Sequence, residues 1–127
     1  MDNLPLSNDR MSPGIWRFAE ALQPVDPENR VTLGEGNTPL VKNVSIARQL
    51  GVQHLYFKLE SGNPTGSYKD RISALGVSRA LELGKKVCVG TSSGNAGASV
   101  AAYAARAGLT YRLLVLEQIV EAKLLQA

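Results

Sequence analysis

An alternation of strand-like and helix-like segments after Pro39 constrains the fold of this 127-residue chain more than any other feature. Apolar residues at positions 55, 57 and 59 alternate with more polar ones, a period that predicts a strand with one better-buried face. The pattern as a whole predicts an α/β fold with a parallel sheet, right-handed crossovers and helices on both faces. The expected strands cover residues 55–59, 86–89 and 110–116, and the expected helices cover residues 44–50, the stretch from Lys69 to Leu83, 95–107 and 117–127.

The first 40 residues differ in composition from the rest, because five of the six prolines lie there. We therefore expect residues 1–40 to be a mostly irregular amino-terminal segment, with a short helix over 15–22 in which Trp16 and Phe18 are packing anchors. Residues 41–127 form the expected α/β domain. Its first helix has Asn43 as a candidate N-cap, and glycines end the helices on either side of the strand 86–89.

Composition excludes several classes of function. The net charge is only +3 and the longest basic run is a pair of lysines, so no nucleic-acid partner is expected. One cysteine, Cys88, and one histidine, His54, leave no set of residues for a disulfide framework or a Cys/His zinc site, and no metal is expected. Cys88 is expected to be buried and inert. With no secretory signal and no uninterrupted apolar span, we expect a cytoplasmic protein with no membrane partner.

A turn-rich loop over residues 61–67 places Lys69 in the first turn of a helix. The positive end of the helix dipole disfavours an ammonium in this position. A neutral lysine amine is the nucleophile that Schiff-base chemistry requires. On position alone, however, a solvated surface lysine is the simpler interpretation, and Asp70 and Arg71 beside it are expected to form a surface ion pair.

A second loop, residues 90–97, has the sequence Gly-Thr-Ser-Ser-Gly-Asn-Ala-Gly and leads from a strand into a helix. Its hydroxyls and the backbone N–H groups at the helix start suit a carboxylate or phosphate. The alternative is a Ser/Asn N-cap with glycines that allow close packing. The glycine spacing fits neither a P-loop nor a dinucleotide fingerprint. Because α/β proteins bind ligands beyond the carboxyl ends of their strands, both loops are candidate parts of a site.

The two loops together resemble a known family. Asn-Pro-Thr-Gly-Ser-Tyr-Lys-Asp-Arg at 63–71 and Thr-Ser-Ser-Gly-Asn-Ala-Gly at 91–97 are similar to the pyridoxal-phosphate (PLP) enzymes of fold type II, the tryptophan synthase β-like family. Ile-Trp-Arg-Phe at 15–18 and Gly-Glu-Gly-Asn-Thr-Pro-Leu at 34–40 make the chain look most like the threonine synthases. The resemblance covers residues 14–127 and implies that family's fold, PLP as cofactor and an amino-acid substrate.

The resemblance also implies roles for individual residues. Lys69 would bind the cofactor covalently and then move protons between substrate carbons. Asn95 would hydrogen-bond the phenolic oxygen of the pyridoxal ring, while Ser67 and Tyr68 would flank the lysine and shape the pocket. The substrate carboxylate would lie against the second loop, largely on backbone N–H groups, at Ser92, Ser93, Gly94, Asn95 and Ala96.

In an enzyme of this kind, O-phosphohomoserine and water become threonine and phosphate, with PLP acting as the electron sink. The form Ser-Ser-Gly-Asn-Ala-Gly is closer to the dehydratase side of the family, so a threonine or serine dehydratase, or a related β-eliminating enzyme, is an alternative. A third alternative is a non-catalytic fragment that self-associates or binds a partner through its sheet edge and the Leu124/Leu125 face.

The resemblance further implies a later glycine-rich loop for the cofactor phosphate. Residues 98–127 contain one glycine, Gly108, and no such loop. We therefore expect the chain to be truncated, to lack the carboxy-terminal cofactor-phosphate domain, and to belong to a homodimer if it is part of the full enzyme.

Overall fold

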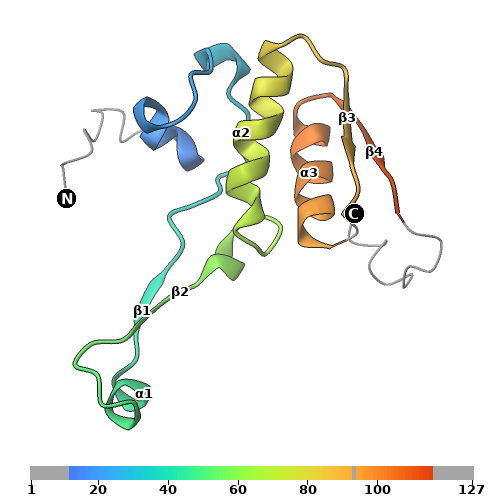
Figure 1. The fold of residues 1–127 in the computed structure, drawn as a ribbon. Helices are drawn as coiled ribbons and strands as arrows, with labels where there is room; N and C mark the ends of the chain where they lie inside the picture. The colour runs from blue at the N-terminus through green and yellow to red at the C-terminus, as the bar shows by residue number, and fades with distance from the viewer. Residues whose placement is uncertain (1–11, 93, 116–127) are drawn as a thin grey trace.

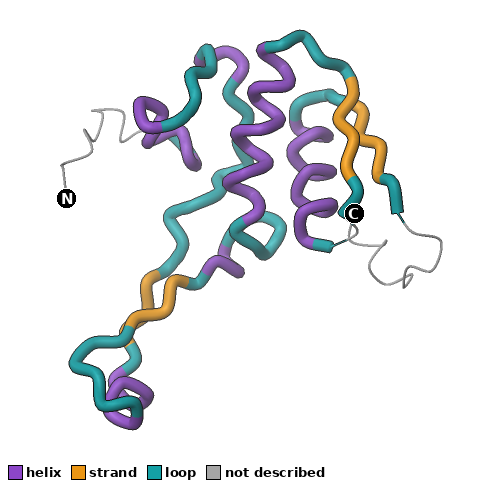
Figure 2. The backbone as a smooth tube through the Cα atoms, viewed as in Figure 1, coloured by secondary structure: helices purple, strands orange, loops and turns teal. Residues whose placement is uncertain are grey.

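The structure is a computed structural model that describes residues 12–92 and 94–115. Figure 1 shows the arrangement of the elements and Figure 2 shows their types. The predicted helix over 117–127, with Leu124 and Leu125, lies outside the described residues. In chain order the elements, with η for 3-10 helices, are η1 (Gly14–Ala21), η2 (Pro27–Asn29), β1 (Leu40–Lys42), α1 (Val44–Gln49), β2 (Tyr56–Lys58), η3 (Glu60–Gly62), α2 (Lys69–Glu82), β3 (Val87–Gly90), α3 (Asn95–Arg106) and β4 (Thr110–Leu113).

A parallel pair of strands, β3 and β4, forms the sheet from which the second loop emerges. Cys88 lies opposite Tyr111 and Gly90 lies opposite Leu113 in this pair. α3 connects the two strands and packs against them, and α2 packs against α3 (Figure 1). The predicted strand–helix–strand unit is confirmed, although β4 ends at Leu113 and the expected strand ran to 116.

Helices cover one face of the β3–β4 pair within the described part of the chain, whereas helices on both faces were expected (Figure 1). Val87 and Val89 are exposed, while Cys88 and Tyr111 pack against the core. Cys88 is a free thiol and is half-buried rather than buried. Cys88 lies on the partly covered side of its strand, and Val87 and Val89 lie on the exposed side.

The strand predicted over 55–59 does not join this parallel sheet. The strand that forms, β2, pairs antiparallel with β1, with Leu40 opposite Lys58, and α1 lies at the tip of this two-stranded arm (Figures 1 and 2). All three residues of β2 are exposed, so the predicted buried face was also wrong. The alternation correctly indicates a strand, but no described element covers either face of the arm.

Local signals at the helix ends are confirmed. Asn43 caps α1, because its Oδ1 accepts a hydrogen bond from the Ile46 N–H at 2.8 Å. α2 and α3 end just before Gly84 and Gly108, whose φ angles of 64° and 68° are the left-handed conformation expected of a helix-ending glycine. No helix in residues 12–92 or 94–115 is long and apolar enough to cross a membrane.

The core lies where η1 and the segment after it meet α2 and α3. Trp16 is 2% exposed, and its indole N–H donates to the Val31 carbonyl at 2.9 Å, as expected of a packing anchor. Phe18 is 41% exposed, and the prediction that it is an anchor was wrong. The backbone kinks at Phe18 (φ −117°, ψ 24°), so its side chain does not continue the buried face of Ile15 and Trp16.

Candidate functional site

The first loop holds its lysine at the very start of α2. The backbone N–H of Lys69 donates to Ser67 Oγ at 3.1 Å, and Ser67 itself is buried. Lys69 Nζ lies 4.7 Å from the centroid of the exposed Tyr68 ring, within the range of a cation–π contact. The structure therefore places Ser67 and Tyr68 beside the lysine, and the roles of all three residues in cofactor binding remain predictions.

Asp70 is fully buried, and the predicted surface ion pair with Arg71 was wrong. The Asp70 carboxylate accepts hydrogen bonds from the Thr65 N–H at 2.7 Å, from the Thr65 hydroxyl at 2.5 Å and from Ser99 Oγ at 2.6 Å. A carboxylate withdrawn from water needs such donors to replace its lost hydration. Asp70 thus connects the loop before Lys69 with helix α3.

Arg71 pairs with Glu60 instead. Its Nε and Nη2 donate to the two oxygens of Glu60 at 3.0 and 2.9 Å, which is a bidentate pair. Thr38 Oγ1 also donates to Glu60 at 2.8 Å, and Asn63 Nδ2 donates at 3.0 Å. Asn63 Oδ1 in turn accepts from the Gly36 N–H at 2.9 Å. These contacts join the segment 34–40 to the first loop, a connection that the sequence analysis missed.

The Glu60 network has a consequence for stability at low pH. The hydrogen bond from Arg71, followed by that from Thr38, lowers the pKa of Glu60 from 4.5 to about 2 against the opposing effect of burial. Between these two values the unfolded chain binds a proton at residue 60 that the folded chain does not bind, so stability rises with pH.

We expect this carboxylate to account for a loss of about 1 kcal/mol in the free energy of unfolding as the pH falls from 4.5 to 2. The figure is small because the side chain is 28% exposed and water screens the pair. Urea unfolding at a series of pH values should give a shallower pH dependence for Glu60→Gln than for the wild type. Equal slopes in the two proteins would show that Glu60 is not held in this way.

The second loop ends at the start of α3. Gly94 is the N-cap residue, and as a glycine it has no side chain with which to cap the helix. The first intrahelical hydrogen bond of α3 runs from the Ala98 N–H to the Gly94 carbonyl. The N–H groups of Asn95, Ala96 and Gly97 therefore have no partner within the helix. Ser92 Oγ accepts from the Gly94 N–H at 3.3 Å. Asn95 is exposed, and Ser93 lies outside the described residues.

Gly97 allows the loop to touch the helix that follows it. A Cβ at position 97 would lie 1.8 Å from the Ser92 carbonyl oxygen, closer than any real contact. The packing interpretation of the loop glycines therefore holds at this position. It does not exclude the anion-binding interpretation, which concerns the backbone N–H groups at the start of α3.

The two loops lie at the same end of the molecule, because α2 and α3 run side by side in the same direction (Figure 1). Ser99, in the second turn of α3, is hydrogen-bonded to Asp70 and Ser73 in the first turns of α2, at 2.6 and 2.7 Å. These buried bonds fix the start of one helix relative to the start of the other. The first turn of α2, which carries Lys69, and the first turn of α3 are thereby held at the same end of the helix pair.

Glu35 is a second fully buried carboxylate, to which the sequence analysis gave no role. It accepts hydrogen bonds from the N–H groups of Ile15 and Leu33 at 3.0 and 3.1 Å, and from the hydroxyls of Thr32 and Tyr103 at 2.9 and 2.7 Å. Burial, together with the bond to Glu35, raises the pKa of Tyr103 well above its usual range. The phenol therefore stays protonated and serves as a donor.

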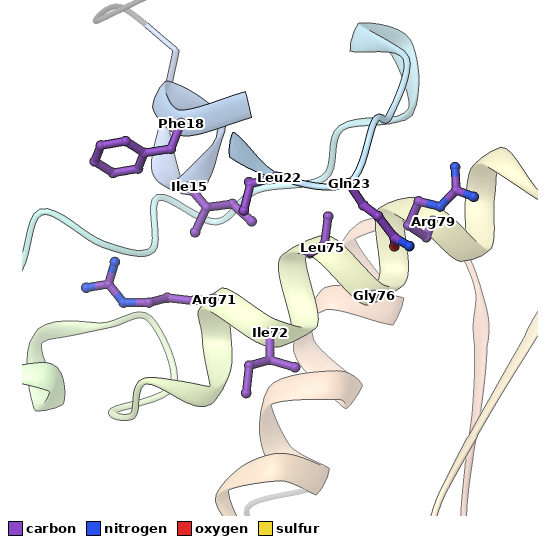
Figure 3. Close-up of a pocket in the computed structure, with 9 residues that line it drawn as sticks. All are labelled: Ile15, Phe18, Leu22, Gln23, Arg71, Ile72, Leu75, Gly76 and Arg79. Carbon is purple, nitrogen blue, oxygen red and sulfur yellow. The ribbon is translucent and has the colours of Figure 1, made fainter. Parts of the chain in front are cut away.

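A separate apolar hollow of about 530 Å³ lies between η1 and α2. Figure 3 shows the residues that line it: Ile15, Phe18, Leu22, Gln23, Arg71, Ile72, Leu75, Gly76 and Arg79. Neither Lys69 nor any residue of the second loop is among them. The hollow is therefore distinct from the candidate site.

Residues 31–127 match the family of pyridoxal-phosphate dependent enzymes. Since this match spans most of the chain, the chain belongs to that family. A solved structure, the O-acetylserine dependent cystathionine beta-synthase from Helicobacter pylori, shares its fold with a TM-score of 0.57. That likeness has 24% sequence identity and covers 80% of this chain and 34% of the other. The predicted fold class, enzyme family and PLP cofactor are confirmed.

Within that family, the chain is similar to threonine synthases, as the sequence motifs predicted. It is 45% identical over 115 residues to that of Methanocaldococcus jannaschii and 49% identical over 119 residues to that of a Bacillus species. It is also 40% identical over 125 residues to that of Mycobacterium tuberculosis. These matches cover 90%, 92% and 97% of this chain, which spans only 28%, 34% and 34% of the relatives' lengths.

The described residues fit the cofactor of this family. Lys69 supplies an amine at the start of α2, and the exposed Asn95 supplies an amide at the start of α3. The N–H groups at the start of α3 suit the negative charge of a carboxylate.

Proposed function

We propose that this chain carries the lysine-bearing part of a threonine synthase-like active site, which converts O-phosphohomoserine and water into threonine and phosphate. The observation that carries the proposal is the placement of Lys69 and the N–H groups at the start of α3 at one end of two hydrogen-bonded helices. Bound PLP supplies an electron sink for the substrate carbanions. The 40–49% identity to threonine synthases over nearly the whole chain supports the choice of reaction.

In this proposal the Lys69 amine holds the cofactor and then carries a proton between substrate carbons. Asn95 hydrogen-bonds the ring oxygen. Ser67 shapes the pocket by accepting the Lys69 N–H, and Tyr68 does so by lying against the Lys69 side chain. The substrate carboxylate binds to the loop at Ser92, Ser93, Gly94, Asn95 and Ala96.

Adding PLP to the purified protein is expected to produce a visible absorption band that the Lys69→Ala variant lacks, because only an amine can attach the cofactor. Lys85→Ala is the matched control, since Lys85 is an exposed lysine beyond the other end of α2. It should retain the band. Weak labelling of equal strength in the wild type and in Lys69→Ala would contradict the proposal.

A dehydratase or another β-eliminating enzyme is the second candidate. It is favoured by the second loop, whose form Ser-Ser-Gly-Asn-Ala-Gly is closer to the dehydratase side of the family. Ala96 and Gly97 in this form leave those two positions of α3 without side-chain hydroxyls. Release of phosphate from O-phosphohomoserine supports the threonine synthase reaction. Formation of an oxoacid from threonine or serine, without phosphate release from O-phosphohomoserine, supports the second candidate.

We also propose a cytoplasmic location and a homodimer for the whole enzyme. The free Cys88 thiol suits a reducing compartment. The arm formed by β1, α1 and β2 exposes large apolar side chains, among them Leu40 and Leu50, and association would bury such a surface.

A further inference from the structure

A single buried carboxylate, Asp70, is bonded to both sides of the candidate site. Two of its three hydrogen bonds come from Thr65 in the loop before the lysine, and the third comes from Ser99 in α3. Asp70 also follows Lys69 directly in the chain. The lysine, its loop and the helix that carries the second loop therefore meet at one side chain.

The burial of this group makes the connection stiff. Asp70 and Ser99 are both fully buried, so water cannot replace a hydrogen bond that is lost between them. A hydrogen bond to a charged group is also stronger than one between neutral groups. Any shift of the first loop relative to α3 must therefore break a bond to a buried charge, and such shifts are disfavoured.

We propose that Asp70, with Thr65 and Ser99, is a positioning group that sets the place of the Lys69 amine relative to the N–H groups at the start of α3. This inference rests on the proposed function, because it assumes that Lys69 holds the cofactor. Asp70 itself touches neither cofactor nor substrate in this scheme. Its effect on PLP binding passes through the backbone of the loop and the first turn of α2.

A purely structural role would give a different result, and Ser78 provides the comparison. Ser78 is also a fully buried serine, and its hydroxyl donates to the Ala74 carbonyl at 2.6 Å and accepts the Val31 N–H at 2.8 Å. Its removal costs buried hydrogen bonds without touching Asp70 or the first loop. Ser78→Ala is therefore matched to Ser99→Ala in chemistry and burial, but not in its connection to the lysine.

The test measures the dissociation constant for PLP, from the visible absorption band, in Ser99→Ala, Thr65→Val, Thr65→Ser and Ser78→Ala. We expect the constant to rise about tenfold in Ser99→Ala and in Thr65→Val, since each loses a hydrogen bond to the buried charge. Thr65→Ser keeps the hydroxyl and should bind as the wild type does. Ser78→Ala should lower the urea midpoint with its PLP constant unchanged.

The exchange rate of the Thr65 N–H with solvent deuterium gives a second readout that needs no cofactor. This N–H donates to Asp70, so its exchange should be faster in Ser99→Ala and unchanged in Ser78→Ala. Failure of the wild type to show a Lys69-dependent band would contradict the proposed function, and the exchange rates would then decide the positioning role. Equal PLP binding and equal Thr65 exchange in Ser99→Ala and Ser78→Ala would overturn that role.

Discussion

Replacing Glu35 by alanine is expected to lower the free energy of unfolding by about 3–5 kcal/mol. The Glu35 side chain is fully buried and accepts four hydrogen bonds. Its removal leaves the Tyr103 hydroxyl and the N–H groups of Ile15 and Leu33 without an acceptor, and it opens a cavity between them. Urea unfolding of the variant and the wild type at neutral pH measures the difference.

Three further variants separate the contributions at this position. Glu28→Ala, in the exposed helix η2, should change stability by less than about 0.5 kcal/mol. The free energy of unfolding of Glu35→Gln should lie between those of Glu35→Ala and Glu28→Ala. Its amide keeps one acceptor oxygen but points an N–H donor toward groups that are themselves donors. The double variant Glu35→Gln/Tyr103→Phe should lose less free energy of unfolding than the sum of the losses in the two single variants. A Glu35→Ala variant as stable as Glu28→Ala would contradict the role of this carboxylate.

The same carboxylate also bears on the candidate site. Glu35 joins η1 and the segment 31–35 to α3 through Tyr103, two turns beyond Asn95. Glu60 joins the following segment to the first loop through Arg71 and Asn63. The amino-terminal third of the chain thus contributes no predicted site residue. Its contacts nevertheless hold in place the first loop and α3, the two elements beside which the predicted site residues lie.

Features with local signals could be predicted from the sequence. Gly84 and Gly108 mark the ends of α2 and α3, and Asn43 marks the start of α1. Lys69 and Gly94 could be placed at helix starts because the turn-rich loops that precede α2 and α3 interrupt the apolar pattern. Each of these signals lies within a few residues of the feature it predicts.

Features that depend on distant partners could not be predicted. Asp70 accepts from a serine 29 residues away, and Glu35 from a tyrosine 68 residues away. Nothing near either carboxylate in the sequence distinguishes it from a solvated one. The pairing of strand β2 could not be predicted for the same reason. Its alternation indicates a strand, but its antiparallel partner β1 is three residues long and too short to show a period of its own.

Replacing Gly97 by alanine is expected to lower the free energy of unfolding by about 1–3 kcal/mol and to displace the second loop. The new methyl group would lie 1.8 Å from the Ser92 carbonyl oxygen, so the backbone of the loop must move. Alanine otherwise favours a helix more than glycine does, by about 1 kcal/mol, so the steric cost must exceed that gain. Urea unfolding measures the net effect, and amide NMR shifts at Ser92 and Ala96 report the displacement.

Gly76→Ala is the matched control, because Gly76 is also a helical glycine but nothing lies within 4 Å of the added methyl group. It should raise stability by about 0.5–1 kcal/mol and leave the loop signals unchanged. Stabilisation of Gly97→Ala to the same extent would mean that the Ser92 carbonyl has room to move and that α3 does not hold the loop. The opposite signs expected for the two substitutions follow from one difference, the presence of a backbone oxygen where the methyl group must go.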